Sequence, residues 1–159
     1  MEYLVTKGVE GATPSLLPYN EVKGEWILSW VFGNDLIQAV LPYKPTIDQI
    51  KAVVVDWYKT MTDDEVLRGF EWKGLFVNLT NEDKLNYKVL YDIAYQTQGK
   101  SLPTTIKFGT DTEPQFHEFT TLEEFTEFYL TTLKFVEGVY QKWWQARASI
   151  DWSKYENLV

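Results

Sequence analysis

The sequence has 159 residues, of which 45% are hydrophobic and 24% charged, with a formal net charge of −8 and no cysteine. A chain of this length holds one domain with a core of its own, and the composition is typical of a folded globular protein. The excess of acidic side chains argues against a nucleic-acid partner and against an anionic membrane, because both need Lys and Arg. Without cysteine there are no disulfides, no thiolate nucleophiles and no Cys-based metal sites.

The first 45 residues differ from the rest and predict a β-rich attachment segment. Prolines are concentrated here, which disfavours helix. Two apolar runs, residues 26–32 and 36–41, flank a Gly-Asn-Asp turn and are typical of two strands in a hairpin. Residues 3–5 are a candidate third strand, and residues 8–23 are expected to form an extended loop.

The extreme N-terminus predicts a cytoplasmic origin. Residues 1–8 lack the basic region and the long apolar run of a signal peptide. No stretch of the chain approaches the roughly 18 apolar residues of a membrane-spanning helix. We therefore expect a chain that is made and folded in a cytoplasm.

A capping box and an apolar stripe predict the first helix. Thr46 and Gln49 fit the capping-box pattern, and apolar side chains then recur at three- and four-residue spacing over residues 47–61. Within residues 69–79, two short apolar runs flank a Lys-Gly pair. This arrangement predicts a small β-hairpin directly after the helix.

A second helix follows this hairpin, and the same order of elements then recurs. Thr80 is the expected cap of the second helix and Gly99 its stop. Its buried stripe is expected to consist of Leu90, Tyr91, Ile93 and Ala94. Strands at residues 104–108 and 116–119 then lead to the longest helix, over residues 121–149, whose apolar stripe is expected to include Leu133. The predicted fold class is α+β, with an N-terminal β segment followed by two β-hairpin/helix units and a long C-terminal helix.

Catalytic and metal chemistry have little support in the sequence. His117 is the only histidine, which excludes a two-His metal site, and no recognisable nucleophile accompanies it. The acidic runs at residues 63–65 and 111–113 lack the ligand spacing of a calcium loop and are better explained as turn and helix-start residues. No glycine-rich phosphate loop is present. We expect no catalytic residue, no metal and no cofactor.

An acidic segment extends from Phe108 to Leu133. It contains six carboxylates and neither Lys nor Arg. Such a segment can steer a basic partner. A solvated face that keeps the protein soluble is the favoured interpretation.

Aromatic residues, 16% of the chain, are the candidate binding residues. They crowd near the C-terminus, where a helix cannot direct Trp143 and Trp144 to the same face, so one should be core and the other exposed. Exposed aromatics here would suit a protein interface or a sugar-stacking surface, although packing of the tail against its own domain is favoured. The candidate interface residues are Trp26, Trp30, Trp144, Trp152 and Tyr155.

Several motifs after residue 45 occur in a distinctive order. They are the hairpin Gly69-Phe70-Glu71-Trp72-Lys73-Gly74, the segment from Leu79-Thr80 to Asn86-Tyr87, the run from Ile106 to Asp111, and the stretch from Tyr140 to Trp152. Over residues 46–153 this order resembles a domain family of unknown function that is common in phage and prophage genomes, often beside or within tail-fibre genes. The resemblance implies a virion or tail-assembly role and no catalytic residues. Residues 1–45 and a short tail, residues 154–159, lie outside it.

We therefore expect a non-enzymatic structural or assembly protein of a bacteriophage virion. It would bind tail, collar or fibre proteins through its β segment and its aromatic C-terminus. A homo-oligomer or several copies in a symmetric assembly are expected. Two alternatives stay open: a carbohydrate-binding module that contacts host glycans through Trp144, Trp152 or Tyr155, and an acidic phage inhibitor of a host nucleic-acid enzyme.

Overall fold

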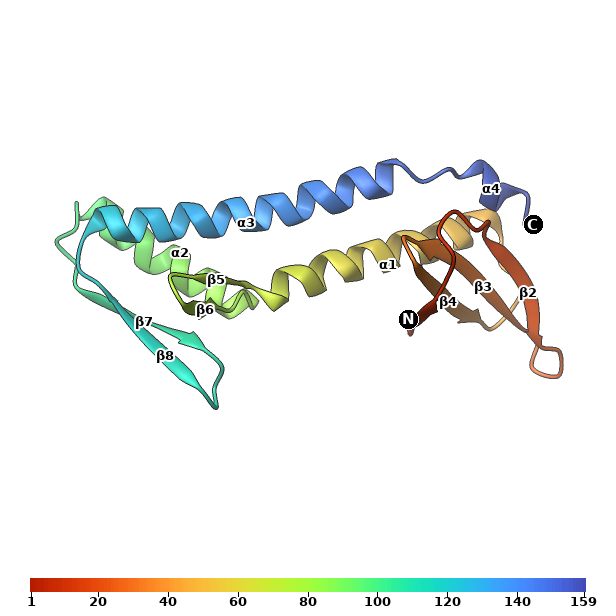
Figure 1. Ribbon diagram of the computed structural model, residues 1–159, viewed down its shortest axis with the longest axis horizontal. Coiled ribbons are helices and arrows are strands. Elements are labelled where there is room, and N and C mark those ends of the chain that lie inside the picture. Colours follow the sequence, from red (N-terminus) through yellow and green to blue (C-terminus); the bar gives the residue numbers. More distant parts are fainter. The chain divides into compact units, whose positions relative to one another are not determined.

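The computed structural model describes all 159 residues and confirms the α+β fold. By backbone contacts the chain divides into a first unit, residues 1–60 with 145–159, and a second unit, residues 61–144. The helices α1 (Ile47–Arg68) and α3 (Leu122–Ala148) each contribute residues to both units (Figure 1). The boundary predicted at residue 45 separates the attachment segment from the part that resembles a phage domain family, and the boundary at residue 153 marks the end of that part. Both stay predictions.

A four-stranded antiparallel sheet forms most of the first unit. Its strands are β1 (Leu4–Lys7), β2 (Ser15–Asn20), β3 (Glu25–Phe32) and β4 (Asp35–Leu41), in the order β1-β4-β3-β2. The predicted hairpin and the predicted N-terminal strand are confirmed.

The prediction of an extended loop over residues 8–23 is wrong for the middle of this segment. Residues 15–20 form β2, which pairs with β3 and places Leu16 in the core. Pro18 is tolerated because β2 lies at the edge of the sheet, where a missing N–H needs no partner strand. The pairing register shifts between Pro18 and Asn20.

One face of this sheet packs on α1. Trp30 of β3 is buried, and its ring meets that of Trp57 edge-on at 6.1 Å between centroids. The hydroxyl of Tyr3 donates to the carboxylate of Asp56 at 2.6 Å. Residues before β1 are therefore fixed to the helix, and burial together with this bond raises the pKa of Tyr3. The short helix α4 (Ser153–Glu156) belongs to the same unit.

The helix α1 begins as predicted but continues beyond its predicted end. The backbone N–H of Thr46 donates to the side-chain oxygen of Gln49 at 2.8 Å, so the capping box is confirmed. The predicted end at residue 61 is wrong, because the helix extends to Arg68 and stops only at Gly69. Residues 63–65, interpreted from the sequence as helix-start residues, lie inside it; no Gly or Pro interrupts this stretch.

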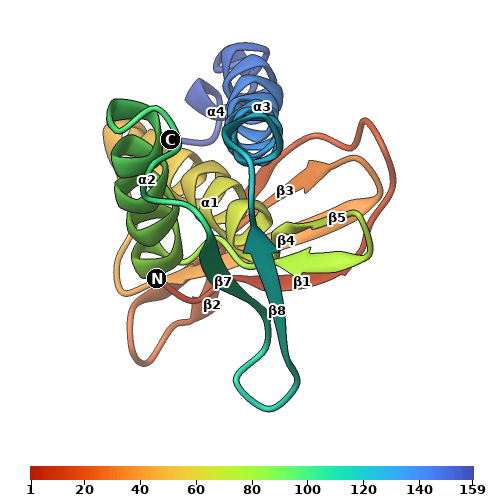
Figure 2. The same cartoon turned by 90° about the vertical axis from the view of Figure 1, so that its left-hand side faces the viewer.

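Two hairpins and two helices make up the second unit together with the end of α1. Its elements are β5 (Phe70–Trp72), β6 (Leu75–Val77), α2 (Asn81–Gln96), β7 (Thr104–Gly109), β8 (Pro114–Phe119) and α3 up to Trp144. Figure 2 shows the β7–β8 hairpin extending away from α2 and α3. Both predicted hairpins and both predicted helices are confirmed. None of the helices combines the length and the apolar composition that crossing a membrane requires.

A cluster of aromatic rings forms the core of the second unit. Phe128 of α3 is 0% exposed and lies within it. Its ring centroid is between 5.1 and 6.4 Å from those of Trp72, Tyr87, Phe108, Phe119 and Phe125. Because these rings come from both hairpins and from α2 and α3, the cluster joins the two hairpins to these two helices.

The buried stripe of α2 differs by one position from the prediction. Ala94 is buried as expected, but Ile93 is exposed and Tyr87 is buried instead. Residues 87, 91 and 94 are four and three positions apart and share a helix face, whereas residue 93 lies about 100° away from residue 94. The apolar character of Ile93 alone gave no information on which face packs.

The cap of α2 is Thr80, as predicted, and it offers a test of local stability. The backbone N–H of Asp83 donates to the Thr80 hydroxyl oxygen at 3.1 Å. Thr80→Ala should lower the free energy of unfolding by about 1 kcal/mol, because a helix N–H loses its partner. Urea unfolding measures this effect, with Thr80→Ser as the control that keeps the hydroxyl. An alanine variant as stable as the serine variant would contradict the assignment.

Candidate functional site

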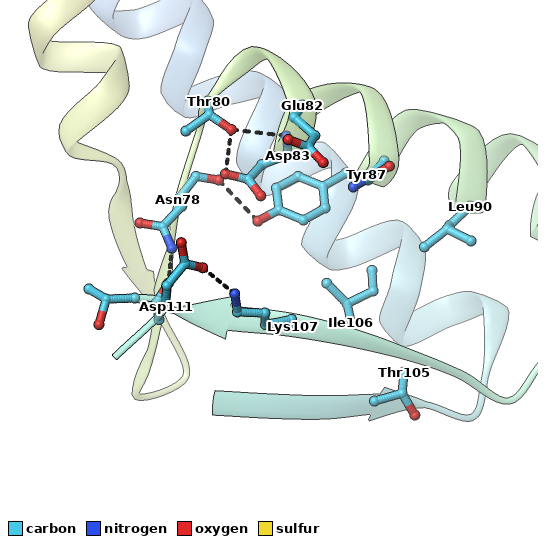
Figure 3. Close-up of a pocket in the computed structure, with 13 residues that line it drawn as sticks. Asn78, Thr80, Glu82, Asp83, Tyr87, Leu90, Thr105, Ile106, Lys107 and Asp111 are labelled. Carbon is cyan, nitrogen blue, oxygen red and sulfur yellow. Dashed lines mark hydrogen bonds and ion pairs between the residues drawn. The ribbon is translucent and has the colours of Figure 1, made fainter. Parts of the chain in front are cut away.

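Two cavities flank α2 in the second unit, and the first of them is polar. It has a volume of about 580 Å³ and lies between the start of α2 and β7 (Figure 3). The Tyr87 hydroxyl donates to the Asn78 carbonyl at 3.0 Å, the Asn78 amide donates to the Gly109 carbonyl, and Lys107 pairs with Asp111. Burial raises the pKa of Tyr87, and the ammonium of Lys107 lowers that of Asp111. These bonds tie the start of α2 to the β7–β8 hairpin and serve the structure.

His117 lies on β8 and is packed against other rings. Its Nε2 pairs with the carboxylate of Glu124, and its ring centroid is 4.6 Å from that of Phe119. Neither neighbour is a nucleophile, and the pair connects β8 to α3. No group of three or more His, Asp or Glu side chains is arranged to hold a metal ion.

The acidic segment between Phe108 and Leu133 is partly neutralised by pairing. Asp111 pairs with Lys107, and Glu127 pairs with Lys73 at 3.2 Å. Both lysines lie outside the acidic segment in the sequence but reach it in space. This pairing leaves a weaker field for steering a basic partner than the sequence indicated.

The second cavity is apolar, and we call it the α2–α3 groove. It has a volume of about 500 Å³. The residues that line it are Lys84, Tyr87 and Lys88 of α2 and Tyr129, Thr132, Leu133, Val136, Glu137, Tyr140 and Trp144 of α3. The two helices run in opposite directions (Figure 1). The groove therefore has a helix for each wall: α3 lines it from Tyr129 to Trp144, and α2 contributes the single turn from Lys84 to Lys88.

Stacked rings mark both ends of the stripe that α3 presents to the groove. At one end Tyr129 stacks on Tyr91 with centroids 4.3 Å apart, which holds the two helices together. At the other end Trp144 stacks on Tyr140 at 5.6 Å and remains 56% exposed. Leu133, between them, is also exposed, although the sequence predicted it as core. The position one residue earlier, Thr132, is buried in its place.

The adjacent tryptophans divide between core and surface, which confirms the prediction for this pair. Trp143 is 8% exposed, and its indole N–H donates to Glu65 at 2.6 Å. Lys142 donates to the same carboxylate at 3.0 Å. Trp143 therefore fixes α3 to the end of α1, and this contact sets the direction in which Trp144 faces.

The other candidate aromatics all lie in the first unit. Trp30 and Tyr155 are buried and serve the core, so their side chains are not accessible to a partner. Trp26 and Trp152 are half-buried; the ammonium of Lys44 lies 5.3 Å from the Trp26 ring and that of Lys51 lies 5.8 Å from the Trp152 ring. The structure therefore does not bring the five candidates together, and Trp144 is the one that is largely exposed.

Sequence reasoning missed the groove itself, although a signal for it exists. The apolar residues of α3 cover more of its circumference than one packed face requires, because Leu130, Leu133 and Trp144 are exposed while Phe128 is buried. A helix in a monomeric protein normally carries one apolar stripe. The additional width indicates a second surface for packing.

Comparison with models of known protein families, with curated proteins and with solved structures found no match. The resemblance to a phage domain family is therefore neither confirmed nor refuted.

The bonds around Glu65 give a pH-dependent test of the contact that orients Trp144. Partial burial raises the pKa of Glu65, but hydrogen bonds from Lys142 and Trp143 outweigh this and lower it overall. Glu65→Gln should cost about 1–2 kcal/mol at neutral pH, because the indole and the ammonium lose a charged acceptor.

The sign of the pH effect follows from the lowered pKa. The pKa of a glutamate carboxyl group is about 4.3 in an unfolded chain. When folding lowers this pKa, the ionised carboxylate stabilises the fold at pH values above about 4.3, and this stabilisation is lost as the pH falls and the group becomes protonated. The difference between wild type and Glu65→Gln in urea unfolding should be large at pH 7 and small at pH 3. An equal difference at both values would show that the charge of Glu65 is not what matters.

Proposed function

We propose that this chain is a non-enzymatic protein-binding component and that the α2–α3 groove is its binding site. The observation that carries the proposal is the exposed Trp144, stacked on Tyr140 at the open end of an apolar groove. Tryptophan and tyrosine are enriched among the residues that dominate binding energy, and they act where they fill or flank a desolvated pocket. A partner that covers this surface would bury a large apolar area at one site.

A protein partner suits the groove better than a glycan does. A sugar ring stacked on Trp144 would need hydrogen-bond partners for its hydroxyl groups. The hydroxyl of Thr132 already donates to the Phe128 carbonyl at 2.9 Å and that of Tyr87 to the Asn78 carbonyl at 3.0 Å, so few free hydrogen-bonding groups remain inside the groove. A glycan array probed with the folded protein should therefore give no signal. A signal that is lost in Trp144→Ala would favour the carbohydrate-binding alternative.

We further propose that the binding partner is a tail, collar or fibre protein of a phage virion. This setting is supported by the resemblance of residues 46–153 to a phage domain family, which rests chiefly on the hairpin from Gly69 to Gly74. The chain would be made in the host cytoplasm and incorporated into the particle as a homo-oligomer or in several copies.

The N-terminal sheet is a second surface available for attachment in this setting. Its edge strand β1 has no proline or bulge, and Leu4 and Val5 on it are exposed. An uncovered edge of this kind can pair with a strand of another protein. Deleting residues 1–45 would remove the sheet that packs on α1, so a smaller change, such as Val5→Pro, is the appropriate test of the edge.

Quantitative mass spectrometry of purified, DNA-filled particles tests the proposed function. We expect the protein at a fixed ratio to the major capsid protein, and a loss of at least tenfold for Trp144→Ala because the anchor of the interface is gone. Tyr95→Ala is the matched control, since Tyr95 is exposed on α2 but does not line the groove.

Two results would contradict different parts of the proposal. Abundance in infected cells with absence from particles would remove the virion setting and favour a chaperone or a host-directed inhibitor. Full incorporation of Trp144→Ala would remove the groove as the site of binding.

A further inference from the structure

We propose that the partner segment bound in the α2–α3 groove is an amphipathic helix of about four turns, with acidic residues on the flank that faces α2. This inference rests on the proposed function, because it names the occupant of the same site. It is argued from the length of the groove, the nature of its walls and its charges.

The length of the groove sets the length of its occupant. Its residues on α3 run from Tyr129 to Trp144 at spacings of three and four. At 1.5 Å per residue this stripe is about 22 Å long, which matches four turns of helix. A helix that binds in a groove presents apolar residues at this same spacing.

The walls of the groove exclude an added strand as the occupant. Both walls are helices, whose backbone N–H and C=O groups bond within the helix. Strand addition needs an open sheet edge with free backbone groups. The contacts available here come from side chains only, and a helix presents side chains to such a trough in register with the walls.

The charges at the rim select an acidic helix. The second unit contains 8 basic and 14 acidic side chains, a net charge of −6. Its α2 wall nevertheless places Lys84 and Lys88 together, four residues apart on the rim of the groove. Lys88 is paired with Asp92 at 2.5 Å, whereas Lys84 takes part in none of the ion pairs of the chain. Carboxylates on the partner would meet this local basic edge.

The α3 wall completes the orientation of the bound helix. It carries Glu137 at the rim, opposite the lysines of α2. A helix with acidic residues toward α2 and a basic residue toward α3 would match both rims, as flanking charges do between paired helices. Charges at a rim chiefly decide which partner and which orientation is accepted, while the apolar floor supplies the affinity.

A second copy of this chain fits the groove less well. Two copies that meet groove to groove about a twofold axis would place two hollows face to face, and neither copy would insert a helix into the other. Each copy also carries a net charge of −8. Like charges at a common interface cost free energy, so self-association through this groove is disfavoured.

Binding of designed peptides to the full chain tests the inference. Three labelled 18-residue helical peptides share one leucine stripe and carry Glu, Gln or Lys on the flank intended to face α2. Fluorescence anisotropy should show the Glu peptide binding about tenfold more tightly than the Lys peptide. The double variant Lys84→Glu/Lys88→Glu should reverse this order, and Trp144→Ala should weaken all three peptides at least tenfold.

A charge-matched control separates the effect of the charges at the groove's rim from the effect of the protein's net charge. Lys23→Glu/Lys59→Glu changes the net charge equally at two exposed residues of the first unit and should keep the wild-type order. Equal affinity for the Glu and Lys peptides, or an order that the Lys84/Lys88 variant does not change, would overturn the inference. So would a dimer in analytical ultracentrifugation that Trp144→Ala abolishes, because the groove would then hold a second copy.

The failure of this inference is distinguishable from the failure of the proposed function. If no peptide binds but particles still lose the Trp144→Ala protein, the groove binds a partner that is not an acidic helix. If particles keep that variant as well, the groove is not a binding site.

Discussion

Phe128→Ala is expected to lower the free energy of unfolding by about 3–5 kcal/mol. Phe128 is fully buried, and its ring contacts aromatic rings from both hairpins and from α2. Alanine leaves a cavity that these rings cannot fill together, because they are fixed to different helices and strands. The cost therefore includes the lost transfer free energy of the ring and the cavity that remains.

Urea unfolding followed by near-ultraviolet circular dichroism measures this effect, since the signal reports the packing of the aromatic cluster. Phe116→Ala is the matched control, because Phe116 is exposed on β8. Its effect should stay within about 0.5 kcal/mol. Similar values for the two variants would show that Phe128 is not the centre of the core.

The second large effect is expected at Gly69, where α1 gives way to β5. Gly69 has φ of +67°, and a Cβ at this residue would lie 1.9 Å from the carbonyl oxygen of Val77. Both the backbone conformation and the close approach to β6 need glycine. Gly69→Ala should cost more than about 3 kcal/mol, because the β5–β6 hairpin has to move away from the end of α1.

Gly138→Ala is the control for this substitution. Gly138 lies inside α3, and a Cβ there would meet no atom within 4 Å. Alanine should raise the free energy of unfolding by about 0.5–1 kcal/mol through its better helix propensity. Thermal unfolding of both variants should thus give shifts of opposite sign, and equal shifts would contradict the close approach at Gly69.

Local signals in the sequence predicted the parts of the fold that depend on neighbours along the chain. The capping box at Thr46 and the cap at Thr80 are satisfied within three residues, and both are confirmed. The same holds for the hairpin turns, whose glycines supply the positive φ that the turns need. These features need no knowledge of the rest of the structure.

The predictions that failed depend on tertiary contacts. The strand β2 contains Pro18 and lies in the segment predicted as an extended loop, and its place at the sheet edge makes the proline acceptable. Ile93 is exposed and Thr132 buried because the packed face of each helix is chosen by the neighbouring element. Hydrophobicity at single positions does not determine that choice.

The candidate site shows the same division. That Trp143 and Trp144 point to different faces of α3 follows from helix geometry alone and was predicted. The groove needs two helices that are distant in the sequence, and its basic rim depends on Lys84 and Lys88 of α2 lying beside α3. No pattern within either segment reports that arrangement.

The central claim is that a partner protein binds over Trp144, and site-specific photo-crosslinking tests it most directly. A benzophenone amino acid replaces Trp144 in one variant and Tyr95 in the other, and both full chains are illuminated in the cells that naturally make the protein. We predict a covalent adduct with one partner protein from position 144, through a helical segment of that partner, and none from position 95. No adduct from position 144, or the same adducts from both positions, would contradict the account.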